Sequence, residues 1–481
     1  MYSNDVDKTP HWLVSLVPLI VLVVFLALVI KAFGADALSG GSQVALMFAA
    51  GVAVAVSMVF YKIPWKRFED AIVDNIRSIG TSVVILLLIG AVAGSWMVSG
   101  VVPTMIYYGA KIIYPSVFLF ATCLICSLIS IMTGSSWTTI ATVGVALIGI
   151  GSAQGFDPGW TAGAIISGAY FGDKMSPLSD TTVLASSSSE TPLFDHIKFM
   201  VVTTLPSFLI SMVVFLVVSL LHPVPAEGQV MDFSEGLKET FNISPWLMLV
   251  PVLTGFMITR KVPAIITLFS AAVFAGIAAL IAQPHLLAEI AGGNGLDFMT
   301  GFKGLLQSYY GSTAIDTGNV ELNDLISTRG MSGMLLTVFL IIAAATFGGA
   351  MVGSGMLQSL TNALVSLVHG RVSMVASSVA TGIFSNMVTG DQYLSIILTS
   401  SLYKKLYKDR GYESKLLSRS VEDSATVTSV LIPWNSCGMT QATVLKVATL
   451  DYLPYCMFNL ISPFMSIIIA ALGYKIVRKS K

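Results

Sequence analysis

Charged residues are scarce in this sequence. Asp, Glu, Lys and Arg make up only 11% of its 481 residues, whereas hydrophobic residues make up 55%. A soluble globular domain carries about 25% charged residues. Most of the surface of the folded chain therefore cannot face water, which excludes an ordinary soluble protein and indicates one that lies in a lipid bilayer.

Motifs of catalysis and of ATP use are also missing. The sequence contains no HExxH, GxSxG, P-loop or other glycine-rich phosphate-binding motif, and its histidines show no spacing typical of a metal site. Basic and acidic residues are equal in number, at 26 each, so no excess of positive charge favours nucleic acid. Neither an enzyme nor an ATP-driven pump is supported, and we expect no cofactor.

Disulfide bonds and a cleaved signal peptide are not indicated either. The four cysteines, Cys123, Cys126, Cys437 and Cys456, lie in apolar or small-residue stretches, so we expect packing thiols. The N-terminus lacks the basic region that begins a signal peptide. We expect the apolar run 13–30 to remain as a first membrane helix.

Long apolar stretches predict an all-α protein with about ten transmembrane helices. A helix that crosses the hydrocarbon core of about 30 Å needs about 20 residues. The candidate segments are 12–31, 44–61, 79–98, 158–188, 199–221, 245–259, 264–282, 332–353, 415–450 and 453–474. Segments 158–188 and 415–450 are long and interrupted by polar residues, so we expect two discontinuous helices there.

Two further regions, 116–152 and 371–407, each have a polar tip between two apolar arms. The tips read MTGSSWTT at 132–139 and VTGDQY at 388–393. Because arms of about 16 residues are short for crossing the bilayer twice, we expect two re-entrant hairpins. Elsewhere, Gly90-x-x-x-Gly94 and Gly168-x-x-x-Gly172 predict close packing between helices.

Basic residues predict the orientation. With a cytoplasmic N-terminus, the inner segments hold 19 of the 26 Lys and Arg residues, as the positive-inside rule requires. The inner segments are the N-terminal tail, 61–78, 189–198, 259–263, 369–371, 403–419 and 475–481. We therefore expect a multi-pass inner-membrane protein with both termini in the cytoplasm.

The two halves of the chain show an internal repeat. Gly134 and Gly390, Pro177 and Pro433, and Asp195 and Asp451 are each 256 residues apart, and Ser99-Gly100 precedes Ser354-Gly355 by 255. Five crossings and one hairpin per half would insert the second half upside down. We expect a first inverted repeat over 1–221, an extracytoplasmic linker over 222–244 and a second repeat over 245–481.

The interruptions at 176–180 (SPLSD) and 432–438 (IPWNSCG) predict a binding site. Non-helical backbone at membrane depth survives only where it lines a cavity or is enclosed by protein. Proline removes a backbone donor, and glycine tolerates unusual dihedral angles. Two simple proline kinks are the alternative, but the polar residues at both breaks favour a central site that the hairpin tips also reach.

Ionisable residues near these breaks are the candidate ligands, because a charge at membrane depth is costly and functional by default. We expect Asp180, Asp173 and Asp423 to bind the cation or proton, and Na⁺ to occupy the same site. The expected neutral oxygen ligands are Ser136, Thr138, Thr139, Thr181, Asn435 and Ser436, and the expected modulating residues are Asp391, Glu422 and Lys174. Structural alternatives are an Asp173–Lys174 ion pair, helix capping by Glu422 and Asp423, and a turn role for Asp391.

Four segments resemble the NhaC family of sodium/proton antiporters: 134–151, 167–186, 390–398 and 418–438. The resemblance extends over essentially the whole chain, and the family also includes sodium-dependent malate/lactate exchangers. It implies a bacterial inner-membrane exchanger with elevator-like movement of a transport domain, often in a homodimer.

We therefore expect a secondary transporter that exchanges sodium or lithium for protons by alternating access. A buried carboxylate that holds either a proton or Na⁺ is the simplest basis for exchange. A sodium-coupled exchanger of small carboxylates such as malate and lactate is the alternative. A membrane enzyme using Ser179 or Cys437 and a channel are weaker alternatives, because no base accompanies either nucleophile and hairpins suit alternating access.

Overall fold

The computed structural model describes residues 10–33, 40–222, 235–260, 262–293, 297–313, 315, 317, 322–323 and 326–476. Within these ranges the chain is helical, and its extended pairing is limited to an isolated bridge between Thr313 and Thr328. The described residues include nine helices that are long and apolar enough to cross a membrane, or ten if the bent pair 449–455 and 457–472 forms one span. The predicted all-α, multi-span architecture is confirmed.

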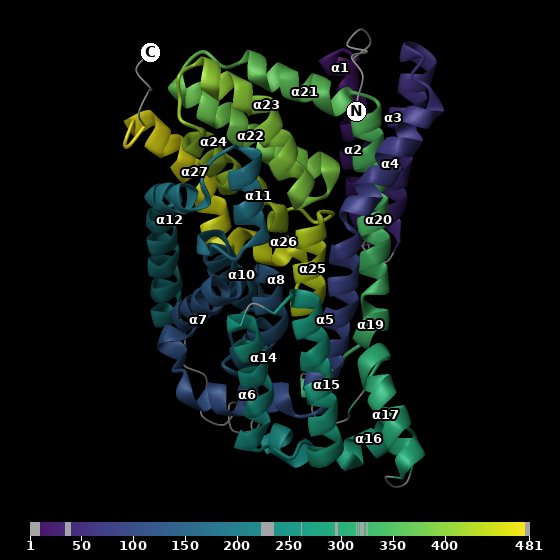
Figure 1. The fold of residues 1–481 in the computed structure, drawn as a ribbon. Helices are drawn as coiled ribbons and strands as arrows, with labels where there is room; N and C mark the ends of the chain where they lie inside the picture. The colour runs from purple at the N-terminus through teal and green to yellow at the C-terminus, as the bar shows by residue number, and fades with distance from the viewer. Residues whose placement is uncertain are drawn as a thin grey trace.

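The helices appear in Figure 1 under the labels used here. In chain order they are α1 (Trp12–Ser15), α2 (Val17–Phe33), α3 (Gly41–Tyr61), α4 (Trp65–Ser78), α5 (Gly80–Val98), α6 (Val101–Ile112), η3 (Pro115–Val117), α7 (Phe118–Thr133), α8 (Ser136–Thr139), η4 (Ile140–Gly144), α9 (Val145–Ala153), α10 (Pro158–Met175), α11 (Asp180–Ser188), α12 (Leu193–Leu221), η5 (Pro245–Met248), α14 (Leu249–Thr259), α15 (Ala264–Ala282), α16 (Pro284–Ile290), α17 (Phe298–Tyr310), α19 (Gly330–Gly333), α20 (Leu335–Gly353), α21 (Met356–Ser366), α22 (Arg371–Thr389), α23 (Gln392–Asp409), α24 (Ser414–Val421), η6 (Glu422–Thr426), η7 (Ser429–Leu431), α25 (Ser436–Leu445), α26 (Thr449–Tyr452), η8 (Leu453–Tyr455) and α27 (Met457–Leu472).

Both predicted helix interruptions are present. The first helix ends with α10 at Met175 and resumes with α11 at Asp180. The second passes from α24 through the π-helical turn η6 and the short η7, and resumes with α25 at Ser436. In each case a helix begins just after the polar break, so its N-terminus and its capping residue lie at the break.

The expectation that the hairpin arms are too short to cross a membrane is wrong. The first arms, Pro115–Thr133 and Ser136–Ala153, contain 19 and 18 residues, and Arg371–Thr389 of the second hairpin contains 19. All three meet the length and hydropathy requirements of a spanning helix. Polar tip residues in the sequence made the arms look shorter, whereas the helices continue up to the tips.

Two central helices, α5 and α20, organise the right-hand part of the fold (Figure 1). Helices α3 and α4 pack against α20, while α15, α17 and α19 pack against α5. Glycines permit these contacts: a Cβ on Gly94 would lie 1.9 Å from the carbonyl oxygen of Ser308, and one on Gly349 would lie 2.6 Å from the Cα of Ile72. Helices α7, α10 and α12 pack together on the left of the view.

Close packing of α10 on α7 confirms the role predicted for the second glycine motif. A Cβ on Gly168 would lie 2.2 Å from the carbonyl oxygen of Cys123, and a Cβ on Gly172 would lie 2.4 Å from that of Ser127. The helix that carries Asp173 is therefore held against the first arm of the hairpin by contacts that exclude any side chain.

Substitution of Gly172 by alanine is expected to lower the thermal unfolding midpoint of the purified protein. The added methyl group would force α10 away from α7, and overpacking of this kind typically costs about 1–3 kcal/mol. Gly51→Ala is the matched control, because a Cβ at this position in α3 would have no atom within 4 Å apart from its chain neighbours and the backbone of its own helix. Equal midpoints for Gly172→Ala and the wild type in detergent would show that α10 and α7 pack less tightly than the structure indicates.

Candidate site in a cavity at the first helix break

A cavity of about 620 Å³ lies where the first helix break meets both hairpin tips. Its walls come from residues 133–138 at the first tip, from Asp173 and 178–181 at the break, and from Gln392 and Tyr393 at the second tip. Residues between 78 and 85 on α4 and α5, and between 258 and 267 on α14 and α15, complete it. The cavity thus joins elements that are distant in the sequence.

The first hairpin tip is built by a left-handed glycine and a capping serine. Gly134, with φ of +66°, ends α7, and a Cβ there would lie 2.7 Å from the backbone of Leu178. Ser135 then caps α8, because its hydroxyl accepts a hydrogen bond from the Thr138 amide at 3.2 Å. Glycine at 134 therefore lets the tip rest directly against the broken helix.

Asp173 connects the broken helix to this tip. Its Oδ2 accepts hydrogen bonds from the amide of Ser136 at 3.1 Å and from the Ser136 hydroxyl at 2.7 Å. The carboxylate lies at the N-terminus of α8, where the helix dipole favours negative charge. Asp173 is only 5% exposed, and it lines the cavity.

Asp180 faces the same cavity but is exposed to it. It is the first residue of α11, and the preceding Ser179 caps that helix by accepting a hydrogen bond from the Thr182 amide at 3.4 Å. The Ser179 hydroxyl also lies 2.9 Å from the hydroxyl of Thr181. One acid, Asp173, is thus already hydrogen-bonded within the protein, whereas Asp180 is open to an ion or water.

Five predicted site residues meet in this cavity, namely Asp173, Asp180, Ser136, Thr138 and Thr181. Asp423 does not line it. Asp423 is fully buried in an ion pair with Lys174 and also accepts a hydrogen bond from the Ser462 hydroxyl at 2.9 Å. The alternative in which Lys174 pairs with its neighbour Asp173 is therefore wrong, because the Lys174 side chain instead reaches η6 and α27.

The remaining predicted residues serve the local structure around the tips and breaks. Asn435 caps α25 by accepting a hydrogen bond from the Cys437 amide at 3.0 Å, and the Ser436 amide donates to the carbonyl oxygen of Gly390 at 2.8 Å. Asp391 caps α23 through the Leu394 amide at 2.9 Å, and the Thr139 hydroxyl donates to the Ser135 carbonyl oxygen at 3.0 Å. None of these side chains appears among the described cavity walls.

Glu422 is fully buried in the π-helical turn η6, and neither of its carboxyl oxygens has a hydrogen-bond partner among the described residues. The predicted alternative that Glu422 and Asp423 cap the start of a helix is wrong. That helix begins earlier, at Ser414, with Glu413 in the N-cap position. Both acids are fully buried, and helix capping does not account for them.

The two hairpin tips share a hydrogen-bond pattern at a separation of 256 residues. Gly134 and Gly390 have φ of +66° and +64°, and both end the first arm. In the first matching pair, the Ser135 amide donates to the Thr133 hydroxyl and the Asp391 amide donates to the Thr389 hydroxyl, both at 3.2 Å. In the second pair, the Thr139 hydroxyl donates to the Ser135 carbonyl oxygen at 3.0 Å, and the Ser395 hydroxyl donates to the Asp391 carbonyl oxygen at 2.8 Å. Equivalent positions in the two halves thus adopt the same local structure.

Sequence reasoning missed several cavity residues. Gln392 lines the cavity and accepts a hydrogen bond from the Cys437 thiol at 2.7 Å, which connects the second break to the site. The repeat offered a signal for this residue, because Gln392 lies 256 positions after Ser136. Ser82 and Thr267 gave no such signal, since only the packing of α5 and α15 brings them to the tip.

The chemistry of the cavity walls favours a cation. Two carboxylates, Asp173 and Asp180, are accompanied by several hydroxyl groups, and none of the described wall residues is Lys, Arg or His. Carboxylate, hydroxyl and carbonyl oxygens are the ligands that hard cations prefer. With walls of one charge sign, the cavity concentrates ions of the opposite sign.

Comparisons with known proteins agree with this chemistry. A model of the Na⁺/H⁺ antiporter family matches residues 168–474. The Na⁺/H⁺ antiporter NhaC of Bacillus subtilis (strain 168) is 36% identical over 425 residues, which cover 88% of this chain and 91% of that protein. NhaC of Alkalihalophilus pseudofirmus is 35% identical over 414 residues, covering 86% and 87% of the two chains. The malate-2H⁺/Na⁺-lactate antiporter of Bacillus subtilis is 33% identical over 415 residues, covering 85% of each. This multi-pass membrane protein therefore belongs to the Na⁺/H⁺ antiporter family.

Proposed function

We propose that this protein exchanges Na⁺ or Li⁺ for protons across the bacterial inner membrane, and that Asp173 and Asp180 bind the exchanged cation. The observation that carries the proposal is the cavity in which both acids face hydroxyl groups of a hairpin tip, with no basic side chain among its described walls. A carboxylate that binds Na⁺ in its ionised form releases it when a proton binds. Such competition at one site couples the two fluxes.

The neutral ligands proposed for Na⁺ are Ser136, Thr138 and Thr181, whose side chains share the cavity with the two acids. Thr139, Asn435, Ser436 and Asp391 support the site indirectly, because their hydrogen bonds fix the tips and breaks. We assign Asp423 a different role from the predicted one. It holds Lys174, and the pair modulates the site by fixing α10 against η6 and α27.

Alternating access in this proposal rests on an inverted repeat over 1–221 and 245–481. The matching hydrogen bonds at the two tips and the left-handed pair Gly100 and Gly355 support the repeat. In an elevator-like cycle, residues 116–188 and 371–450 would move as a transport domain against a scaffold. The remaining helices would supply that scaffold and the contact of a homodimer.

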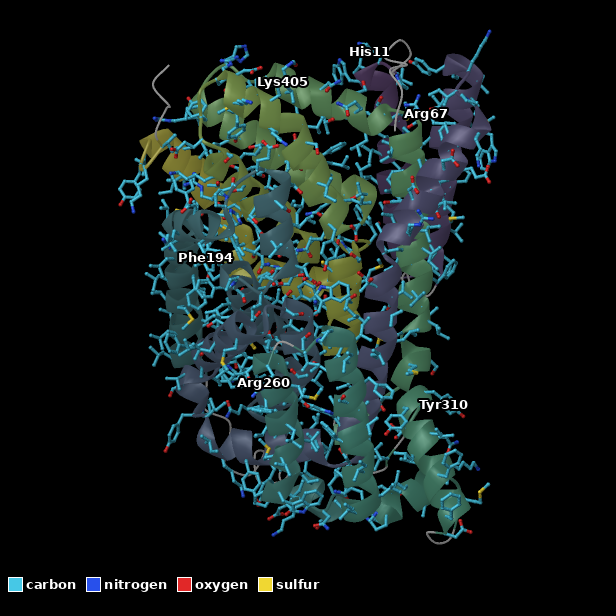
Figure 2. All side chains as sticks on the ribbon, viewed as in Figure 1. His11, Arg67, Phe194, Arg260, Tyr310 and Lys405 are labelled. Carbon is cyan, nitrogen blue, oxygen red and sulfur yellow. The ribbon has the colours of Figure 1, made fainter. Side chains whose placement is uncertain are left out.

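The proposed topology places both termini in the cytoplasm. Two segments predicted to be cytoplasmic meet in the structure, because Lys404 forms an ion pair with Glu190 at 2.5 Å. On the predicted outer side, His222 contacts the carbonyl oxygen of Gln154 at 3.3 Å, and Gln283 accepts a hydrogen bond from the Asn242 amide at 3.0 Å. Figure 2 also shows Arg67 and Lys405, both in segments predicted to be cytoplasmic, at the same end of the molecule. Most of the linker 222–244 lies outside the described residues.

A sodium-coupled exchanger of small carboxylates is the second candidate. The relative named as a malate-2H⁺/Na⁺-lactate antiporter favours it, as do the N-termini of α8 and α11 at the cavity, which would attract an organic anion. The carboxylates of Asp173 and Asp180 oppose it, because they would repel the anion. In this version Na⁺ would be only the coupling ion.

Proteoliposomes distinguish the two candidates. An imposed Na⁺ gradient is expected to move protons in the absence of any organic acid, because the proposed exchange requires only Na⁺ and protons. Addition of malate or lactate should leave the initial rate of the internal pH change within about twofold. Proton movement that requires malate or lactate would establish the second candidate instead, and liposomes without protein provide the control.

A further inference from the structure

The second break contains a π-helical turn, η6, that buried side chains hold in place. Turns of this kind are rare and are frequent at functional sites. The side-chain amide of Asn386 on α22 donates to the carbonyl oxygen of Ala425 at 2.7 Å. From the other side, the amide of Asn459 on α27 donates to the carbonyl oxygen of Val427 at 2.8 Å. The wide turn is therefore a fixed element of the structure.

Glu422 begins this turn with a carboxyl group that has no hydrogen-bond partner among the described residues. The residue is 0% exposed, and both of its carboxyl oxygens are unpartnered. The hydroxyl of Thr426, four residues further on, and Oδ2 of Asp423 also lack a partner, although both residues are fully buried. Buried polar groups in proteins are nearly always hydrogen-bonded. Packing alone does not explain this arrangement.

Ionisation of Glu422 is unfavourable in this conformation. A carboxylate buried without partners costs so much free energy that the group takes up a proton instead. Lys174 is the nearby cation, but it already pairs with Asp423 and donates to the hydroxyl of Ser462 at 3.3 Å. The conformation thus favours Glu422 as the neutral acid.

The groups around Glu422 determine which cation it can bind. Lys174 and Asp173 act on it from α10, and Asp423 acts on it from the same turn. The helices α11, α22, α23, α24 and α27 also pack against η6. Their titratable side chains are Asp180 on α11, Arg371 on α22, Tyr393, Tyr403, Lys404, Lys405, Tyr407, Lys408 and Asp409 on α23, and Lys415 and Arg419 on α24, whereas α27 has none. The ammonium of Lys174 would repel a metal cation, and no group of three or more His, Cys, Asp or Glu residues within the described ranges could hold one. A proton is the cation that suits this position.

We propose that Glu422 is a second proton-binding residue of the exchanger, separate from the cation cavity, and that Na⁺ bound at Asp173 promotes release of its proton. The inference rests on the proposed function, because it takes Asp173 as a Na⁺ ligand. The negative charge of Asp173 opposes ionisation of Glu422, and a bound Na⁺ cancels that charge. By reciprocity, ionised Glu422 strengthens Na⁺ binding. On release the carboxylate keeps the bonding electron pair, and the proton passes to water.

The pH dependence of Na⁺ binding tests this proposal. Each proton that Na⁺ binding releases lowers the Kd for Na⁺ tenfold for each unit by which the pH rises. Isothermal titration calorimetry with NaCl on the purified protein in detergent gives the slope of log Kd against pH. For Glu422→Gln we expect this slope to be smaller by about one than for the wild type. Because glutamine stays neutral, the variant should also bind Na⁺ about tenfold more weakly at alkaline pH.

Transport provides an independent measurement. In proteoliposomes with a fixed Na⁺ gradient and no membrane potential, the opposing pH gradient that stops net flux of radiolabelled Na⁺ gives the number of protons exchanged per Na⁺. Glu422→Gln is expected to exchange one proton fewer than the wild type. Glu190→Gln is the matched control, because the Glu190 side chain is 67% exposed and pairs with Lys404. This control should match the wild type in both measurements.

A second variant keeps the test independent of the glutamine substitution. Thr426→Val preserves the size of the side chain but removes the hydroxyl that favours ionised Glu422. The increase of Na⁺ affinity with pH is therefore expected to occur at a higher pH than in the wild type. Glu422→Gln/Thr426→Val should show the slope of Glu422→Gln alone, because no titratable carboxyl then remains for the hydroxyl to influence.

The outcomes distinguish this proposal from the proposed function. Absence of Na⁺-driven proton movement in the wild type would overturn the proposed function itself. With normal wild-type exchange, an unchanged slope and proton ratio in Glu422→Gln would overturn only the role of Glu422, and a lower unfolding midpoint would then indicate a structural role. Loss of Na⁺ binding at every pH in folded Glu422→Gln would also contradict the proposal, because Glu422 would be a direct Na⁺ ligand. If Glu422→Gln does not fold, an unchanged pH response in Thr426→Val has the same consequence.

Discussion

Replacement of Asp180 by asparagine is expected to reduce Na⁺-driven proton movement by about 100-fold. Asparagine keeps the size of the side chain but removes its negative charge. Two unit charges 4 Å apart attract each other by about 4 kcal/mol at an effective dielectric constant of about 20, and water in the cavity screens part of this attraction. Asp180 is the acid exposed to the cavity, so we expect its charge to act directly on the incoming cation.

Everted membrane vesicles allow this loss to be measured as the Na⁺-dependent change in internal pH. Asp195→Asn is the matched control, because Asp195 is an exposed acid in the first turn of α12 and lies outside the described cavity walls. Immunoblots of the membranes should show equal amounts of both variants. Wild-type exchange in Asp180→Asn would remove this residue from the proposed site.

Asp173→Asn should distinguish the negative charge of this side chain from its hydrogen bonds to the hairpin tip. The oxygen of an asparagine at 173 can still accept the two hydrogen bonds from Ser136, so the hairpin tip should stay in place. We therefore expect loss of exchange with little change in thermal stability. If stability fell as strongly as activity, the main role of Asp173 would be to hold the tip.

Hydropathy was sufficient to predict most of the fold. Long apolar stretches of the sequence coincide with helices α2, α3, α5, α15 and α20. The two helix breaks occur at Ser176 and Pro433, as the polar interruptions predict. The hairpin tips were also predictable, because glycine followed by polar residues ends one helix and caps the next. Arm length was not predictable to the same degree, since tip residues at 132–133 and 388–389 belong to α7 and α22.

The site was predictable only where local sequence determines it. Asp173 and Ser136 both come from polar interruptions, and the interruptions meet because the hairpin packs on the helix that follows it. The partner of Lys174 was not predictable, because it lies on η6, 249 residues further along the chain. Ser82 and Thr267 belong to ordinary apolar helices, so their place in the cavity depends wholly on tertiary packing.

The sequence predicts that Asp423 binds the cation, whereas the structure places it in an ion pair with Lys174. As a partner of the fully buried Lys174, it should be required for stability. Removal of one member of a buried ion pair leaves the other charge unpaired in a medium of low polarity, which costs about 3–5 kcal/mol. We therefore expect Lys174→Met and Asp423→Leu each to lower the unfolding midpoint strongly.

The double variant Lys174→Met/Asp423→Leu should regain most of the lost stability, because two apolar side chains of similar volume leave no buried charge. A double-mutant cycle measured by thermal unfolding in detergent isolates this coupling. Lys66→Met is the control, since the Lys66–Asp70 pair at 3.0 Å is exposed on α4 and should have no measurable effect. If Asp423→Leu instead kept wild-type stability and lost Na⁺ binding, Asp423 would be a cation ligand, as its position near the second break first suggested.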